Sequence, residues 1–132
     1  MTYLMKGDGY RPDLLPKVRS PKIMATMDEM PCTTRVSSLY PGHRCSLTLR
    51  TEVGAHERGY GAGMATKTTD MGVAASCDNC HAIIDGVDQK RRTYIEEKCP
   101  TAFEVRLRKG LMETHAMLLI AGVIIIKDAK FV

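Results

Sequence analysis

The sequence lacks tryptophan, and aromatic residues make up only 5% of its 132 residues, whereas hydrophobic residues make up 44%. A core built from this set must be largely aliphatic, and the nine methionines suit the filling of its irregular gaps. A chain of this length is most simply one domain with a modest core. We therefore expect a single small domain that would benefit from a bound metal as an additional brace.

Long apolar runs are also absent. The longest, Ala116 to Ile126, has eleven residues, well short of the roughly 20 that a membrane-spanning helix needs. The N-terminal region carries Asp8, Arg11 and Asp13 and has no apolar segment like that of a signal peptide. We expect no membrane association and a reducing, cytoplasmic setting.

A strong excess of charge of one sign is absent too. The formal net charge is +4, which is compatible with a polyanionic partner but too small to identify one. The charge alone agrees equally well with a mildly basic globular protein that has no nucleic-acid role.

The most informative pattern is the run Cys77-Asp78-Asn79-Cys80-His81. Two thiolates separated by two residues can reach one tetrahedral zinc ion from a tight turn, and the adjacent histidine then faces another direction. The five cysteines are an odd number, and this spacing suits a metal better than disulfide bonds. The same CxxCH pattern occurs in c-type haem attachment, but that reading requires export, for which the sequence offers no signal.

Cys32 and Cys45 are available as a second pair of zinc ligands. Together with Cys77 and Cys80 they would form a closed structural site with no position for a substrate. The separation of Cys32 from Cys45 is longer than a tight turn needs, so the alternative is that both are small buried hydrophobic residues. Cys99, which precedes Pro100, is predicted to be a buried or surface thiol.

The first half of the chain predicts short elements. Residues 1–20 mix glycine, proline and charge, which indicates a flexible arm. Proline at the first turn predicts a short helix over residues 21–27. The residues that follow predict three strands and a glycine-containing loop, namely strands over Thr34–Leu39, Glu52–His56 and Met71–Ala75 and a loop over Gly59–Gly63.

A helix is predicted after the third strand. Ser76 or Asp78 can cap its start, and the helix runs through His81 and Ile84 to end near Gly86.

The C-terminal third predicts a longer helix. Thr101 and Glu104 match the capping-box pattern, and the helix runs to about Ala121 with Gly122 as its stop. Val123–Ile126 is predicted as a final buried or strand segment.

The histidines differ in context. His81 is set apart because a zinc site would fix its backbone, and Asp85 lies one helical turn beyond it, where it could ligate a metal or orient the imidazole. The alternative for Asp85 is a carboxylate at the helix end that pairs with a nearby cation. His56 lies in a predicted strand, whereas His43 in a turn and His115 in the long helix carry no functional signal.

Lys67 and Asp70 lie between the glycine-containing loop and the third predicted strand. A lysine there can contact phosphate, and an aspartate can hold a metal or orient His56. The alternative is that both are ordinary loop charges.

The order of these residues resembles the YbcO-like endodeoxyribonucleases of lambdoid prophages, small members of the HNH, or His-Me finger, nuclease class. The resemblance extends over about Pro21–Val132 and leaves residues 1–20 unaccounted for. Its motifs are Cys32, Cys45, Ala55-His56, the glycine-containing loop, Thr66-Lys67, Asp70, Cys77-x-x-Cys80-His81, Asp85 and Gly122-Val123-Ile124.

The resemblance implies an α+β fold over residues 21–132. It is a small zinc-braced ββα-metal domain of the HNH type, with an N-terminal helix and a long C-terminal helix. In this motif two strands and a helix surround one catalytic divalent ion, and a separate structural zinc braces them.

The resemblance also implies catalytic roles for His56, Asp70 and His81. His56 matches the general base, His81 matches the helix histidine that holds the catalytic ion, and Asp70 matches the middle position. Ala55 stands where the family usually has an acidic or histidine neighbour, so Asp70 or Asp85 is the expected carboxylate ligand. The implied cofactors are a structural Zn²⁺ and a catalytic Mg²⁺ or Mn²⁺, although an imidazole and carboxylate set would also admit zinc or nickel.

Several basic residues are candidate DNA contacts. Arg58 shares a face with His56 if the strand extends that far, and Arg35 and Lys67 complete the main set. Lys90, Arg91 and Arg92 are further candidates for phosphate contacts.

We therefore predict a metal-dependent DNA endonuclease that hydrolyses phosphodiester bonds. Its substrate would be DNA, branched or single-stranded, in phage recombination or replication in the cytoplasm of a bacterial host, and a homodimer would suit a two-fold junction. One alternative, motivated by Ala55, is a non-catalytic zinc module that binds DNA or a phage protein. Another is a structural zinc protein with no nucleic-acid role.

Overall fold

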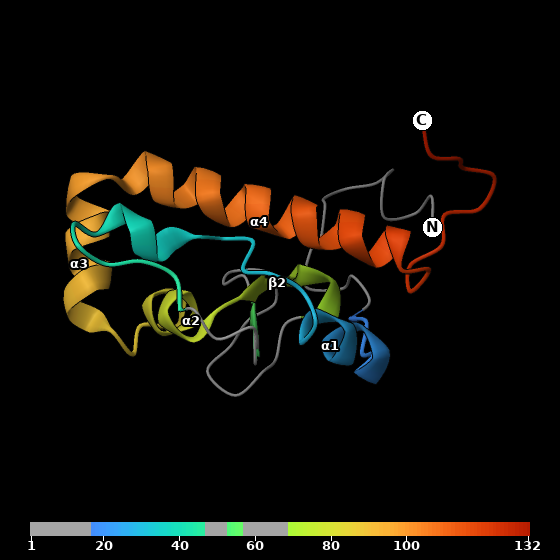
Figure 1. The fold of residues 1–132 in the computed structure, drawn as a ribbon, viewed down its shortest axis with the longest axis horizontal. Helices are drawn as coiled ribbons and strands as arrows, with labels where there is room; N and C mark the ends of the chain where they lie inside the picture. Colours follow the sequence, from blue (N-terminus) through green and yellow to red (C-terminus); the bar gives the residue numbers. More distant parts are fainter. Residues whose placement is uncertain (1–16, 47–52, 57–68) are drawn as a thin grey trace, which may run out of the picture.

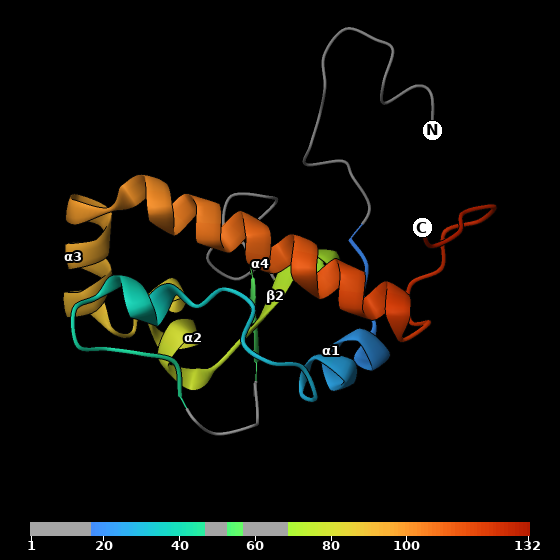
Figure 2. The same ribbon diagram turned by 45° about the horizontal axis from the view of Figure 1, so that its top comes forward.

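A computed structural model describes residues 17–46, 53–56 and 69–132, with the backbone alone for 53–56. The chain mixes helices with a short two-stranded sheet, as expected. Helix α4 (Pro100–Ile120) runs along one side of the domain, and the sheet and helix α2 (Asp78–Asp85) lie beneath it (Figures 1 and 2). Helix α1 (Pro21–Met27) lies at one end and α3 (Gln89–Lys98) at the other.

Helix α1 follows its local sequence signals. Ser20 is the N-cap, and its side chain accepts a hydrogen bond from the Ile23 amide at 3.2 Å, while Pro21 occupies the first turn. A proline is favourable there because its missing N–H would have no partner inside the helix. The helix buries Ile23 and Met27, and the prediction over residues 21–27 is confirmed.

The sheet pairs β1 (Val53–His56) with β2 (Val73–Ser76) in antiparallel register, so that His56 is opposite Val73. Both strands lie within or next to the predicted ranges. The prediction over Met71–Ala75 began too early, because Asp70–Gly72 forms a 3₁₀ turn, η4. The Thr69 side chain caps this turn by accepting the Met71 amide hydrogen bond.

The strand predicted over Thr34–Leu39 is wrong. Val36–Leu39 is a 3₁₀ helix, η3, and Arg35 before it has the left-handed conformation with φ of 50°. A strand cannot pass through such a residue. The β-branched residues Thr34 and Val36, which suggested a strand, are fully buried without forming one.

Helix α2 is capped by Cys77 rather than by Ser76 or Asp78, and it ends as expected at Gly86, whose φ is 84°. Glycine adopts this conformation without the steric cost of a side chain. Helix α3 was not predicted. It is capped by Asp88 and buries only Ile95, so its sequence lacks the apolar periodicity that identifies helices.

Helix α4 matches its predicted length, but the capping box is wrong. Cys99 is the N-cap and makes no side-chain capping bond, so Thr101 lies inside the first turn. The helix ends at Ile120, and Gly122 follows with φ of 74°. Beyond it, Val123 and Ile124 pack against the core without forming a strand. Within the described ranges, no helix has the length and apolarity needed to cross a bilayer.

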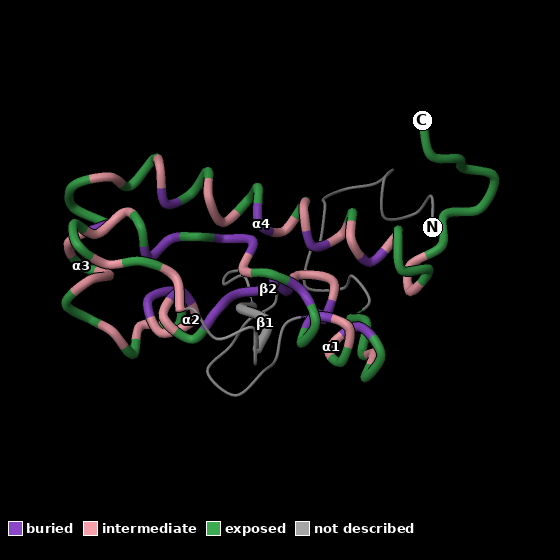
Figure 3. Tube along the Cα trace, viewed as in Figure 1, coloured by how far each residue is buried: buried purple, intermediate pink, exposed green. Residues whose placement is uncertain are grey.

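Two small aliphatic clusters form the core. The cysteine-side core lies around α2, and the α1-side core lies between α1, β2 and α4. Figure 3 shows that the buried positions of α4 face these clusters. The cysteine-side core consists of Val36, Cys77, Cys80, Ile83, Ile84, Ile95 and Phe103, and the α1-side core of Ile23, Met27, Met30, Val73, Ala75 and Leu118.

Hydroxyl groups join β2 to α4 between the two cores. The Ala75 amide donates to the Thr114 hydroxyl at 3.0 Å, and the Ala75 carbonyl accepts from the amide and hydroxyl of Thr33, each at 2.8 Å. Thr114 in turn donates to the Gly110 carbonyl one turn earlier in α4. The edge of β2 away from β1 is therefore hydrogen-bonded by threonines, which satisfies backbone groups that would otherwise be buried without partners.

Gly110 allows α4 to approach this segment closely. A Cβ at this position would lie 2.7 Å from Thr34 Cγ2 and 3.1 Å from Thr34 Cα. We expect Gly110→Ala to lower the free energy of unfolding by about 1–2 kcal/mol, because overpacking outweighs the gain of about 1 kcal/mol in helix propensity. Urea unfolding checks this result. The double variant with Thr34→Ser, which lacks the methyl group, should recover part of the loss, and a more stable Gly110→Ala protein would contradict the close approach.

Candidate functional site

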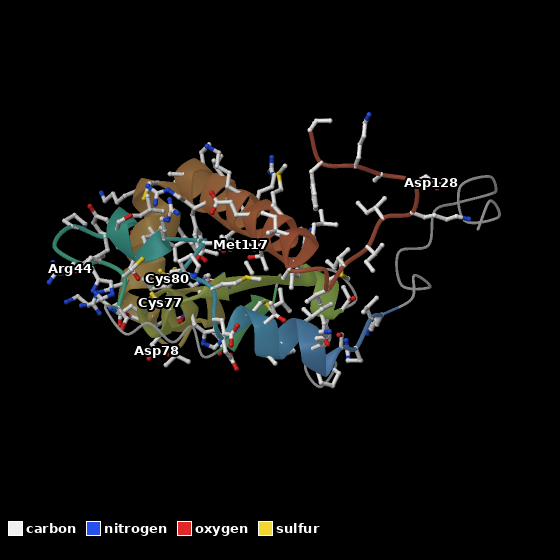
Figure 4. All side chains as sticks on the ribbon, turned by 45° about the vertical axis from the view of Figure 1, so that its right-hand side comes forward. Arg44, Cys77, Asp78, Cys80, Met117 and Asp128 are labelled. Atoms are coloured by element: carbon white, nitrogen blue, oxygen red, sulfur yellow. The ribbon has the colours of Figure 1, made fainter. Side chains whose placement is uncertain are left out.

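Four cysteines from three segments meet in one cluster. Cys32 lies between α1 and η3, Cys45 follows η3, and Cys77 and Cys80 lie at the start of α2, where Figure 4 labels them. Their sulfur atoms all lie within 4.8 Å of one another, and Cys77 and Cys80 are buried. Both cysteine pairs therefore meet as the sequence predicted, and the group can hold a metal ion such as zinc.

The distances suit a metal better than disulfide bonds. The Cys45 and Cys80 sulfur atoms are 3.6 Å apart, far from the roughly 2.05 Å of a disulfide, and all five cysteines are free thiols. Zinc bonds of about 2.3 Å in a tetrahedron place sulfur atoms about 3.8 Å apart. The cluster therefore needs only small adjustments to fit a tetrahedral ion.

Backbone and hydroxyl donors point at the sulfur atoms. Ser37 approaches Cys80 Sγ with its amide at 3.4 Å and its hydroxyl at 3.1 Å, and the Ser46 amide donates to Cys77 Sγ at 3.3 Å. The Cys80 amide also donates to Cys77 Sγ, which makes Cys77 the N-cap of α2. Donors of this kind stabilise thiolates and orient metal ligands.

The thiols cannot all ionise without a cation. Hydrogen bonds with Cys32 and Cys77, together with burial, raise the pKa of Cys80. Burial, followed by the nearby charge on Cys32, raises the pKa of Cys45 to about 12. Hydrogen bonds from Cys77 and Cys80 lower the pKa of Cys32. Ionisation of Cys32 is thus favoured and that of Cys45 and Cys80 is opposed in the protein without metal, and a divalent cation would let Cys45 and Cys80 lose their protons.

His81 and Asp85 lie one helical turn apart on α2, with His81 half-buried and Asp85 exposed. In the parts of the chain that the structure describes, the four cysteines are the only His, Cys, Asp or Glu group of three or more within reach of one ion. The His56 side chain lies outside those parts. A second metal site at His81 and Asp85 therefore stays a prediction.

The structure describes only part of the remaining predicted site, which consists of His56, Arg58 and Lys67. His56 is the last residue of β1. Arg58 and Lys67 lie outside the described residues, so their predicted contacts with DNA remain expectations.

Asp70 has a structural role that the sequence did not suggest. It is only 8% exposed, and its Oδ2 accepts the Ser20 amide hydrogen bond at 2.7 Å. The Asp70 amide donates to the Val18 carbonyl at 2.8 Å, and the Val18 amide donates to Thr69 Oγ1 at 2.9 Å. The end of the segment predicted as an arm is thus bound to the turn before β2.

Three of the predicted basic residues, Arg35, Arg91 and Arg92, have carboxylate partners within the protein. The Arg35 guanidinium lies 4.0 Å from Glu113 on α4 and is largely exposed. Arg91 pairs with Asp88 at 2.8 Å and Arg92 with Glu96 at 2.6 Å. Lys90 is exposed at the start of α3.

Sequence reasoning also missed an aromatic group next to the cysteine cluster. The Tyr40 ring contacts the rings of His43 and Tyr94, and the Arg91 guanidinium lies 5.2 Å above it. Burial, followed by the charge of Arg91, lowers the pKa of His43. Tyr40 and His43 are far from Arg91 and Tyr94 along the chain, so no sequence pattern indicates that they meet. The contact of Ser37 with Cys80 was also missed, because the segment around Ser37 suggested a strand.

Comparisons with known proteins add no relative. No protein-family model, no curated protein and no solved structure matches this chain.

Replacing one cluster cysteine should weaken metal binding selectively. We expect Cys80→Ser to lower zinc affinity by at least about 100-fold, the upper end of what the loss of an outer-shell partner costs. Cys99→Ser, which removes the cysteine outside the cluster, should leave the metal content unchanged. Metal analysis of both purified variants checks this, and equal loss from the two would contradict the assignment of the ligands.

Metal affinity should rise with pH. At neutral pH the metal-free protein holds protons on Cys45 and Cys80, whose pKa values are raised, and the metal-bound thiolates hold none. Binding therefore releases at least these two protons, and the affinity should increase by at least about 100-fold per pH unit near neutrality. Competition with a chelator, corrected for the chelator's own protonation, measures this slope. A pH-independent affinity would show that the thiols are already ionised.

Proposed function

We propose that this chain is a metal-dependent DNA endonuclease of the His-Me finger type. The observation that carries the proposal is the order and pairing of three elements. The antiparallel strands β1 and β2 are followed directly by α2, which packs against β1. His56 ends β1, His81 lies in the first turn of α2, and the cysteine cluster lies where β2 meets α2.

This arrangement supports the expectation drawn from the resemblance. A hairpin that carries one histidine precedes a helix that carries another, and a closed sulfur site braces the start of that helix. Four thiolates leave no open position on a tetrahedral ion. The cysteine site therefore serves structure, and the proposed chemistry takes place elsewhere.

The proposed reaction uses His56 as the general base. An imidazole whose pKa is near neutral accepts a proton from water at cellular pH. The water oxygen then attacks the phosphorus, and the bond to the leaving oxygen breaks.

His81 and Asp85 would hold the catalytic divalent ion. When bound, Mg²⁺ or Mn²⁺ offsets the phosphate charge and stabilises the leaving oxygen. We assign Asp85 rather than Asp70 as the carboxylate ligand, because Asp85 is exposed one helical turn after His81 on α2, whereas Asp70 is only 8% exposed.

A non-catalytic zinc module that binds DNA or a phage protein is the second candidate. It is favoured by Ala55, which offers no ligand where the family usually has one, and by the structural hydrogen bond of Asp70. Such a module would bind DNA in a salt-dependent manner without cutting it.

Replacing the proposed base tests the nuclease. We expect the full chain with Mg²⁺ or Mn²⁺ to cut plasmid, branched or single-stranded DNA, and His56→Ala to lower the rate by at least about 100-fold. His43→Ala is the matched control and should keep the wild-type rate. Zinc content and circular dichroism verify that both variants fold.

The same experiment separates the two candidates. A folded His56→Ala protein that cuts at the wild-type rate would refute the assigned base. DNA binding by the wild type without cleavage under either metal would favour the zinc module.

A further inference from the structure

Helix α4 has a second apolar face that covers nothing within the described residues. We call Val105, Met112, Ala116 and Ile120 the outer stripe. These residues follow one another at intervals of seven, four and four, which keeps them on one side of a helix. Val105, Met112 and Ile120 are 39%, 66% and 76% exposed. The opposite side of the helix faces the core and carries the buried residues Phe103, Gly110, Thr114 and Leu118.

The C-terminal tail carries further exposed apolar side chains. Ile125, Ile126 and Phe131 are 83%, 57% and 74% exposed. Figure 3 shows the tail leading away from the body beyond the end of α4, and Figure 4 labels Asp128 in it. Several exposed apolar side chains in one region are a common mark of an interaction site.

We propose that the outer stripe binds the same stripe of a second copy of this chain, with the two α4 helices antiparallel. Lys109 lies within the angular range of the stripe, between Val105 and Met112 along the helix, and Glu113, one turn later, lies beside it and is also 4.0 Å from Arg35. In an antiparallel pair centred near Leu111, Lys109 of each copy faces Glu113 of the other. Two ion pairs then form across the two-fold axis, as an isologous interface requires.

The apolar residues fit the same register. Val105 of one copy comes opposite Ala116 of the other, so a larger side chain meets a smaller one, and the two Met112 side chains meet near the axis. Methionine adapts its shape to such a position. A parallel pair would instead place Lys109 beside Lys109 and Glu113 beside Glu113, and these like charges repel each other.

The extent of the surface also agrees with a dimer. Helix α4 has 21 residues and is about 31 Å long. A specific interface buries roughly 800 Å² on each partner, more than four side chains supply. Because the helices run in opposite directions, the tail of one copy leaves α4 beside the first turns of the partner's α4, where its apolar side chains add to the contact.

The first experiment replaces the centre of the stripe. Sedimentation equilibrium of the full chain should give a dimer with a Kd in the range of about 1 μM to 100 μM. Met112→Glu should raise that Kd at least about tenfold, because it places two like charges at the axis. Val87→Glu is the matched control, since Val87 is 77% exposed but lies between α2 and α3, and it should leave the Kd unchanged.

The second experiment tests the register by charge exchange. Lys109→Glu and Glu113→Lys should each raise the Kd several-fold, because each creates like-charge pairs across the axis. The double variant restores opposite charges in the reverse order and should return the Kd toward the wild-type value. Zinc content and circular dichroism verify the fold of each variant.

Three outcomes would overturn the proposal. The first is a wild-type chain that is monomeric at about 100 μM, as expected if residues 1–16 cover the stripe instead. The second is a dimer that Met112→Glu leaves intact. The third is a double charge variant no tighter than either single variant. None of these readouts depends on DNA cleavage, so the dimer and the nuclease are tested separately.

Discussion

The convergence of four sulfur atoms is the constraint on which the structure depends. Cys32, Cys45 and the Cys77–Cys80 pair come from three segments, and between Cys32 and Cys45 the chain forms only turns and the 3₁₀ helix η3. The adjoining core is small and has no tryptophan. In small zinc domains, metal binding contributes about 10–16 kcal/mol to folding, more than the net stability of most domains. A metal in this cluster would therefore determine whether the segment from Cys32 to Cys45 and the start of α2 keep their conformation.

The parts of the fold that the sequence predicted are those with local causes. Pro21 fixes the start of α1, and Gly86 and Gly122 mark helix ends through backbone conformations that other residues adopt at a cost. The spacing of Cys77 and Cys80 identified the candidate metal site because two ligands on one turn need no distant information. Cys32 and Cys45 could be proposed as the second pair of ligands only because they were available thiols, since no local pattern links them to Cys77 and Cys80.

The wrong predictions arose where distant contacts overrode local preference. The residues around Val36 favour a strand by composition, yet closure of the cysteine cluster requires a tight turn, which Arg35 begins. Helix α3 is charged on nearly every side and Ile95 is its one buried residue, so no apolar period revealed it. The partner of the Asp70 carboxylate is a backbone amide about fifty positions away, and no pattern of side chains can show such a contact.

The threonines that satisfy Ala75 have a further consequence. A two-stranded sheet normally offers an open row of amides and carbonyls to any extended peptide that approaches it. Here Thr33 and Thr114 occupy that row on β2, and α4 lies over it. A neighbouring chain therefore cannot pair with Ala75, which opposes extension of the sheet from this side.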